Sequence, residues 1–160
     1  MAEVKPGARI PDELAAFLES GLSLALGTRN ADLAPNGTRA WAIQVAADRT
    51  HVTVFVEARS ATPLLADLEA HPQAAVVFDR PSDSRACQIK GRFVDSRRAR
   101  PAERAFVERQ VDDFKADLEK IGVARALTAG WRSWPCVAVR ILVTDLFHQT
   151  PGPGAGERMR

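Results

Sequence analysis

The chain has 160 residues, of which 46% are hydrophobic, and this suffices for one compact domain with a continuous core. Its 22 basic and 20 acidic residues give a formal net charge of +2 and are evenly spread, which argues against nucleic-acid binding and favours small-molecule ligands. The N-terminal sequence MAEVKPGARIPDEL carries charges and prolines where a secretory signal needs an apolar run, and no segment has the length of a membrane span, so we expect a cytoplasmic protein without membrane contacts.

The first third of the chain predicts a short helix and three strands. Residues 11–20 combine acidic residues in the first turn with apolar residues on one face, which is typical of an amphipathic helix. The apolar run 22–28 leads into a turn rich in Asn, Asp, Pro and Gly, and residues 38–46 form a second extended segment. Valines alternate with other residues in 51–57, which favours a third strand that pairs with the second.

The middle of the chain predicts a second helix and two more strands. Thr62 is a suitable N-cap and Pro63 follows it at the first helical position, so we expect a helix over 62–70. The apolar run 74–78 suits a strand that is buried on both faces. A charged turn that contains proline then leads to a strand over 85–95, which we expect to pair with it.

The last third predicts the longest helix and a final strand. Apolar residues recur every three or four positions in 101–121, with Glu and Arg between them. Residues 134–147 end in a strand in which Val137, Val139, Ile141 and Val143 share one face. The Gly- and Pro-rich segment 150–160 is expected to be a flexible tail.

Together these elements predict a mainly β (α+β) fold, an antiparallel six-stranded barrel with flanking helices. Hairpins join most of the strands, and the strand-helix alternation of a doubly wound parallel sheet is missing. No repeat and no domain boundary is visible. We therefore expect a single domain over 1–160, with its core at about 10–148.

The common catalytic signatures are missing from the sequence. There is no GxSxG, no Walker loop, no HExxH, and no GxGxxG between a strand and a helix. The alternating acidic and basic residues of 101–121 are explained by a solvated helix face. No residue is therefore assigned a catalytic role.

The cysteines and histidines also lack a pattern for chemistry. Cys87 and Cys136 lie in apolar surroundings without CxxC spacing, so we expect small buried side chains rather than a disulfide or a metal site. His51, His71 and His148 are far apart and have no further ligand at metal-binding spacing. No metal ligand is assigned.

One stretch carries a more specific signal. GTRAWAIQV, residues 37–45, is followed by a strand that runs into a helix, then by His-Pro, an apolar strand and the polar strand CQIKG. This order resembles the pyridoxamine 5'-phosphate oxidase superfamily over roughly 14–147. The resemblance implies a split β-barrel that binds FMN, works as a homodimer and carries out flavin-mediated redox chemistry on a small molecule.

The resemblance also implies which residues hold the cofactor. Arg39 is the candidate phosphate ligand, because a guanidinium makes a two-point contact with phosphate and keeps its charge. Trp41 and Ala42 would line the flavin ring, and Thr62 would offer its hydroxyl and the helix amides to the phosphate. The complete set implied as cofactor-binding is Arg39, Ala40, Trp41, Ala42, Glu57, Ala58, Arg59, Ser60, Thr62 and Gln88.

The sequence departs from the family pattern in two places. Leu64 stands where the family has a lysine at the start of the short helix, and Gln44 stands where a lysine is usual in the preceding strand. Arg59 or Lys90 would have to supply the missing positive charge. The C-terminal pattern of the oxidase itself is not reproduced, so the substrate is not assigned.

Three further readings stay open. Trp131, Trp134 and Arg140 approximate positions at which relatives bring residues from the second subunit to the cofactor, although interface packing would also select the two tryptophans. A non-catalytic dimeric binding module that has lost flavin affinity is one alternative to a flavin enzyme. Another is a split barrel that binds haem or a deazaflavin. For haem, His148 would be the only histidine late in the sequence that is available as an axial ligand.

Overall fold

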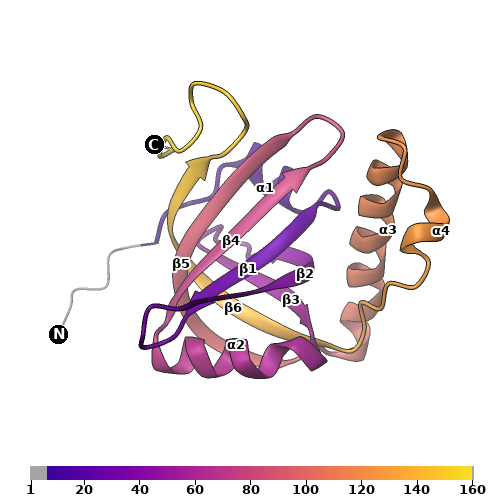
Figure 1. Ribbon diagram of the computed structural model, residues 1–160. Coiled ribbons are helices and arrows are strands. Elements are labelled where there is room, and N and C mark those ends of the chain that lie inside the picture. Colours follow the sequence, from indigo (N-terminus) through magenta and orange to yellow (C-terminus); the bar gives the residue numbers. More distant parts are fainter. Residues whose placement is uncertain (1–6, 160) are drawn as a thin grey trace.

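The computed structural model describes residues 7–159 and consists of a closed, six-stranded antiparallel β-barrel with flanking helices (Figure 1). Around the barrel the strands follow the order β1-β2-β3-β6-β5-β4. The strands are β1 (Ser23–Arg29), β2 (Pro35–Val45), β3 (His51–Glu57), β4 (Gln73–Arg80), β5 (Arg85–Arg98) and β6 (Cys136–His148). The helices are α1 (Asp12–Leu18), α2 (Ala58–Ala70), the 3-10 turn η1 (Pro101–Glu103), α3 (Arg104–Lys120) and α4 (Arg125–Thr128). The prediction of an antiparallel six-stranded barrel is confirmed.

The barrel interior is filled by alternate residues of the strands. On β3, Val52, Val54 and Val56 are fully buried and belong to one large apolar cluster with residues of the other five strands. The cross-strand pairs of β3 with β6 carry this alternation over to Val139 and Ile141. Because successive side chains of a strand point to opposite faces, each strand supplies the core with every second residue.

A β-bulge interrupts this alternation on β2. Ala40 pairs with Val56 and Ala42 pairs with Phe55, so Trp41 is the extra residue. Ala40 lies in the main core, whereas Ala42 belongs to a second apolar cluster outside the barrel wall. The bulge therefore turns Ala42 to the outer side of the barrel and Ile43 into the core, whereas uninterrupted alternation from Ala40 would have placed these two residues the other way round.

Beyond the bulge, the outer edge of β2 leaves β1 and needs other hydrogen-bond partners. The last residue of β2 that pairs with β1 is Ala40. Gln110 of α3 then bonds both backbone groups of Ile43, and the Glu19 carboxylate accepts from the Val45 N–H at 2.8 Å. Side chains thus provide hydrogen-bond partners for backbone groups of β2 that no neighbouring strand pairs with.

The helices close the barrel and cover part of its wall. α2 lies across the lower end in Figure 1, and α1 contributes Leu14, Phe17 and Leu18 to the core from the other end. α3 stands beside the barrel and packs on β2, with Val107 in the second apolar cluster. None of the helices in residues 7–159 is long and apolar enough to cross a membrane.

Helix α2 begins earlier than the sequence predicts. Its first residue is Ala58 and its N-cap is Glu57, so Thr62 lies in the second turn and the prediction of a Thr62 cap is wrong. Pro63 is inside the helix rather than at its first position. The cause is the direct continuation of β3 into the helix, which the packing of Ala61, Leu64 and Leu68 on the barrel stabilises.

Two other expectations differ from the structure. β4 is buried on one face only, since its burial alternates along the strand and Val77 is 39% exposed. The C-terminal segment, expected to be flexible, is held against β6 by three backbone hydrogen bonds, with Gly156 and Met159 as donors and Glu157 as an acceptor. Both cysteines are buried and free, as expected.

Candidate functional site

Four residues lie in register across the outer face of the barrel and link the predicted cofactor residues. Arg39 of β2 pairs with Ala25 of β1, Ala25 with Val77 of β4, and Val77 with Gln88 of β5. Neighbouring strands lie about 4.8 Å apart, so roughly 14 Å separates Arg39 from Gln88. A hollow of about 560 Å³ lies over this row. Its polar side chains are Arg39, Gln88 and the hydroxyls of Ser23 and Thr38, and the rest of the lining is small or apolar. We call these four residues the Arg39–Gln88 row.

Arg39 is held by three aromatic rings. Its Cζ lies 5.3 Å from the ring centroid of Trp131, 5.6 Å from that of Phe114 and 5.7 Å from that of Trp41. The rings also contact one another, with Trp131 stacked on Phe114 at 5.6 Å and tilted against Trp41 at 5.6 Å. Cation–π contacts of this kind hold a guanidinium in place without using its N–H donors.

The donors of Arg39 remain available for a ligand. Among residues 7–159, neither a hydrogen-bond acceptor nor a carboxylate at ion-pair distance engages its guanidinium, and the side chain is exposed. A guanidinium that is fixed in position and has free N–H groups is suited to two-point recognition of a phosphate or carboxylate. The role of Arg39 as a phosphate ligand, which the family resemblance implies, stays a prediction.

The predicted strand residues divide into exposed and buried ones. Trp41 is partly exposed next to Arg39, whereas Ala40 and Ala42 are buried with 2% and 0% exposure. Ala40 lies inside the barrel and Ala42 lies in the cluster with Phe55 and Val107. The side chains of these two alanines are thus turned away from the hollow.

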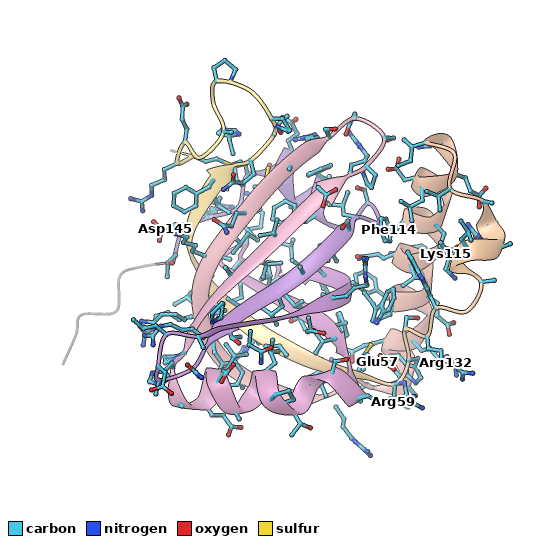
Figure 2. The ribbon with its side chains drawn as sticks, viewed as in Figure 1. Glu57, Arg59, Phe114, Lys115, Arg132 and Asp145 are labelled. Atoms are coloured by element: carbon cyan, nitrogen blue, oxygen red, sulfur yellow. The ribbon has the colours of Figure 1, made fainter. Side chains whose placement is uncertain are left out.

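The start of α2 forms a charged corner close to Arg39. Ala40 pairs with Val56, so Arg39 and Glu57 lie on adjacent strands, one residue beyond this pair. In Figure 2, Glu57, Arg59 and Arg132 lie at this corner, where β3 ends and the segment before β6 passes. A backbone hydrogen bond of 3.0 Å from the Ala58 N–H to the Pro135 carbonyl joins the two segments.

Glu57 places a negative charge at the N-terminus of α2. The carboxylate interacts favourably with the helix dipole but repels any other anion that approaches the same amides. It also acts on a neighbour: burial, with a smaller contribution from Glu57, raises the pKa of the Cys136 thiol to about 12. Cys136 is therefore a neutral, inert thiol rather than a nucleophile.

The remaining predicted residues are spread over two places. Ser60 is partly exposed in the first turn of α2, whereas Thr62 is exposed in the second turn, where the amides already serve the helix. Lys90 does not lie at this corner, because it follows Gln88 along β5 and lines a different hollow. Of the two substitutes named for the missing lysine, only Arg59 is at the start of α2.

The aromatic support of Arg39 was missed from the sequence. Phe114 has the spacing of an ordinary core residue, and Trp131 was expected to reach the cofactor of a second subunit, whereas it contacts Arg39 of its own chain. Arg132 also gave no sequence signal. No group of three or more His, Cys, Asp or Glu side chains able to hold a metal ion is found in the described part of the chain.

The fold and the Arg39–Gln88 row define a split-barrel protein with an exposed arginine, surrounded by aromatic rings, on its outer wall. Comparison with family models matches residues 10–132 to the pyridoxamine 5'-phosphate oxidase model. The chain therefore belongs to the pyridoxamine 5'-phosphate oxidase family.

Solved structures share the fold at low sequence identity. A Lactobacillus delbrueckii protein provisionally named pyridoxamine 5'-phosphate oxidase is 12% identical with a TM-score of 0.54, over 87% of this chain and 93% of that one. HupZ of group A Streptococcus is 14% identical with a TM-score of 0.55, over 92% and 99%. An F420 reductase is 17% identical with a TM-score of 0.53, over 86% and 98%. No curated protein matches the sequence.

Proposed function

We propose that the protein binds FMN at the Arg39–Gln88 row and serves as an FMN-dependent, oxidoreductase-like protein. The observation that carries this proposal is Arg39, whose guanidinium is fixed by three aromatic rings while its donors stay free. A phosphate group is the natural partner for such a guanidinium. Membership of the family supports the choice of FMN as the molecule that carries this phosphate.

The lining of the hollow fits the rest of the cofactor. Its volume of about 560 Å³ lies within the range of small-molecule sites, and Ala25 and Gly27 leave a flat strip of backbone on which a planar ring can lie. Gln88 offers an amide at the far end of the row for hydrogen bonds to ring heteroatoms. FMN would supply the redox chemistry, while the protein residues anchor and orient it.

The corner at α2 contributes positive charge from Arg59 and, in this proposal, from Arg132. These two arginines offset Glu57 and replace the lysine that the family has at Leu64. Ser60 adds a hydroxyl in the first turn of the helix. In this proposal Thr62, which lies beyond that turn, contributes little to phosphate binding.

We further propose a homodimer that forms through the outer face of β1, β2, β4 and β5. This face carries small residues, including Ala25, Gly27 and Gly37, and Val77 stays 39% exposed in the single chain. A flat, uncovered sheet face of this kind is a suitable surface for a second copy. A cytoplasmic location and a small-molecule substrate complete the proposal.

The test begins with the absorption spectrum of the purified protein. A flavin gives a yellow protein, haem gives a Soret band, and a deazaflavin gives a spectrum distinct from both. FMN is then titrated into apoprotein and followed by quenching of tryptophan fluorescence, since Trp41 and Trp131 contact Arg39.

Arg39→Gln should weaken FMN binding strongly, whereas Arg98→Gln, an exposed arginine on β5 outside the hollow, should not. Wild-type protein that binds no FMN would overturn the proposal and leave a binding module without flavin.

A further inference from the structure

A second hollow adjoins the Arg39–Gln88 row on the same sheet face. Its volume is about 660 Å³, which is within the usual range for small-molecule sites. Both hollows share Gly27 and Ala75, so the second begins two residue pairs along the strands from the Ala25–Val77 pair of the row. Its lining comes from β1, β2, β4, β5 and β6, which makes it a feature of the barrel wall rather than of one loop.

Three cationic side chains line this hollow, namely Arg29 of β1 and Lys90 and Arg92 of β5. Arg92 pairs directly with Gln73 across β4 and β5. Arg29 donates from Nη2 to Oε1 of the same Gln73 at 2.8 Å, so the two arginines flank one glutamine. Lys90 lies two residues from Arg92 and therefore on the same face of β5.

The charge of the hollow is not neutralised within the described part of the chain. Its one carboxylate, Asp145, forms an ion pair with Arg158, which turns the C-terminal segment toward the rim. Among residues 7–159, no carboxylate forms an ion pair with Arg29 or Arg92. Lys90 packs its ammonium over the ring of Phe147, 5.0 Å from the centroid.

The floor of the hollow is apolar and lacks large side chains. It includes Gly27, Ala74, Ala75 and Gly91. A Cβ at Gly27 would meet no atom closer than 3.8 Å, so the space above this residue is open. An apolar floor with cations on one side suits a molecule that has both an anionic group and a small hydrocarbon or ring portion.

We propose that this hollow binds a small organic oxyanion, a carboxylate or a phosphate ester. Arg29 and Arg92 hold the anionic group from both sides of Gln73, and the Gly27–Ala75 floor contacts the apolar part. The arginine pair acts as a charged clamp because guanidinium groups match the geometry of oxyanions. This site is distinct from Arg39 and does not depend on FMN binding. It lies on the sheet face that we propose as the dimer interface, so in the homodimer the anion would be held between the two copies.

The test uses methyl phosphate and succinate as probes for the two oxyanion classes, with binding to the full chain followed by NMR line broadening of the probe. Arg39→Gln serves as the background, because Arg39 would itself bind phosphate. In that background, Arg29→Gln and Arg92→Gln should each weaken probe binding about tenfold. Arg98→Gln removes the same charge from the same strand outside the hollow and should leave binding unchanged.

The outcomes separate this site from the flavin proposal. Preference for one probe identifies the oxyanion class, and FMN binding that is retained when Arg92→Gln is made alone, with Arg39 intact, supports two separate sites. Equal weakening by Arg98→Gln would mean general electrostatic attraction and would overturn the proposal. So would absence of probe binding to Arg39→Gln protein whose circular dichroism matches that of the wild type.

Discussion

The side chain of Gln110 replaces a neighbouring strand for Ile43. Its Nε2 donates to the Ile43 carbonyl at 2.9 Å and its Oε1 accepts from the Ile43 N–H at 3.1 Å. Gln110 is 1% exposed, so water does not compete for these bonds. One amide on α3 thus holds the free edge of β2 just beyond the bulge at Trp41.

Gln110→Leu should therefore destabilise the fold. The substitution leaves a buried N–H and a buried carbonyl without partners, which costs about 3 kcal/mol of unfolding free energy. Urea denaturation followed by circular dichroism measures the change. Gln44→Leu, an exposed glutamine on the same strand, is the control and should change stability by less than about 0.5 kcal/mol. Equal stability of Gln110→Leu and wild type would contradict this role for α3.

Trp131 is expected to matter for FMN affinity through Arg39. Trp131→Leu removes the nearest of the three rings around the guanidinium, and cation–π contacts contribute about 0.5–2 kcal/mol. FMN binding measured by calorimetry should weaken by a factor of about 3 to 30. Trp131→Phe keeps a ring at this position and should restore most of the affinity.

Trp134→Phe provides a second comparison, since Trp134 packs in the neighbouring apolar cluster and makes no ring contact with Arg39 among the described residues. A loss of affinity in Trp134→Phe as large as that in Trp131→Leu would show that packing, rather than the ring over Arg39, is responsible.

Sequence patterns predicted the strands because their alternation reflects burial directly. The valines of β3 and the alternating residues of β6 face the core that the fold requires. The start of α2 was mispredicted because Thr62 and Pro63 form a strong local cap signal, and tertiary packing of Ala61 and Leu64 extends the helix past it. At this point the burial of apolar side chains outweighs the local sequence preference for a helix start at Thr62.

The candidate site was only partly predictable for a different reason. Arg39 was found through family resemblance, but its aromatic support joins residues 41, 114 and 131, which are far apart in the sequence. The bulge at Trp41 has no single-sequence signature, and it decides which residues of β2 face outward. Arg29 and Arg92 likewise meet at Gln73 only because of the strand register, which could not be predicted from the turn sequences alone.

Glu57 is expected to oppose FMN binding. Its carboxylate lies at the N-cap of α2, beside the strand that carries Arg39, where the proposed phosphate would sit. Glu57→Gln removes a like charge and should tighten FMN binding by a factor of about 3 to 10. Calorimetric titration at several salt concentrations measures the effect, which should shrink as salt rises.

The same substitution has a second readout. Glu57→Gln should lower the pKa of Cys136 slightly from its value of about 12, because the Coulombic contribution of Glu57 is lost while burial remains. Unchanged or weaker FMN binding in Glu57→Gln would show that the phosphate does not bind near the start of α2. Glu69→Gln, an exposed acid on the same helix, is the matched control.

Glu103 should make the stability of the fold depend on pH in the acidic range. A two-point hydrogen bond from Arg97, at 2.6 and 2.8 Å, lowers the pKa of Glu103 from 4.5 to about 2. Since the folded-state pKa lies below the unfolded value, the stabilisation is complete above about pH 5 and is lost as the pH falls toward 2. The pair links the end of β5 to η1 at the start of α3.

Glu103→Gln should therefore lower the unfolding free energy at pH 7 by about 1 kcal/mol, the upper range for a surface pair with two-point geometry. The difference from wild type should shrink steadily between pH 5 and pH 2, as the wild-type carboxylate takes up its proton. Urea denaturation at closely spaced pH values measures it, with the exposed Arg104–Glu108 pair as control through Glu108→Gln. A difference that stays constant down to pH 2 would mean that Glu103 contributes by packing rather than by its charge.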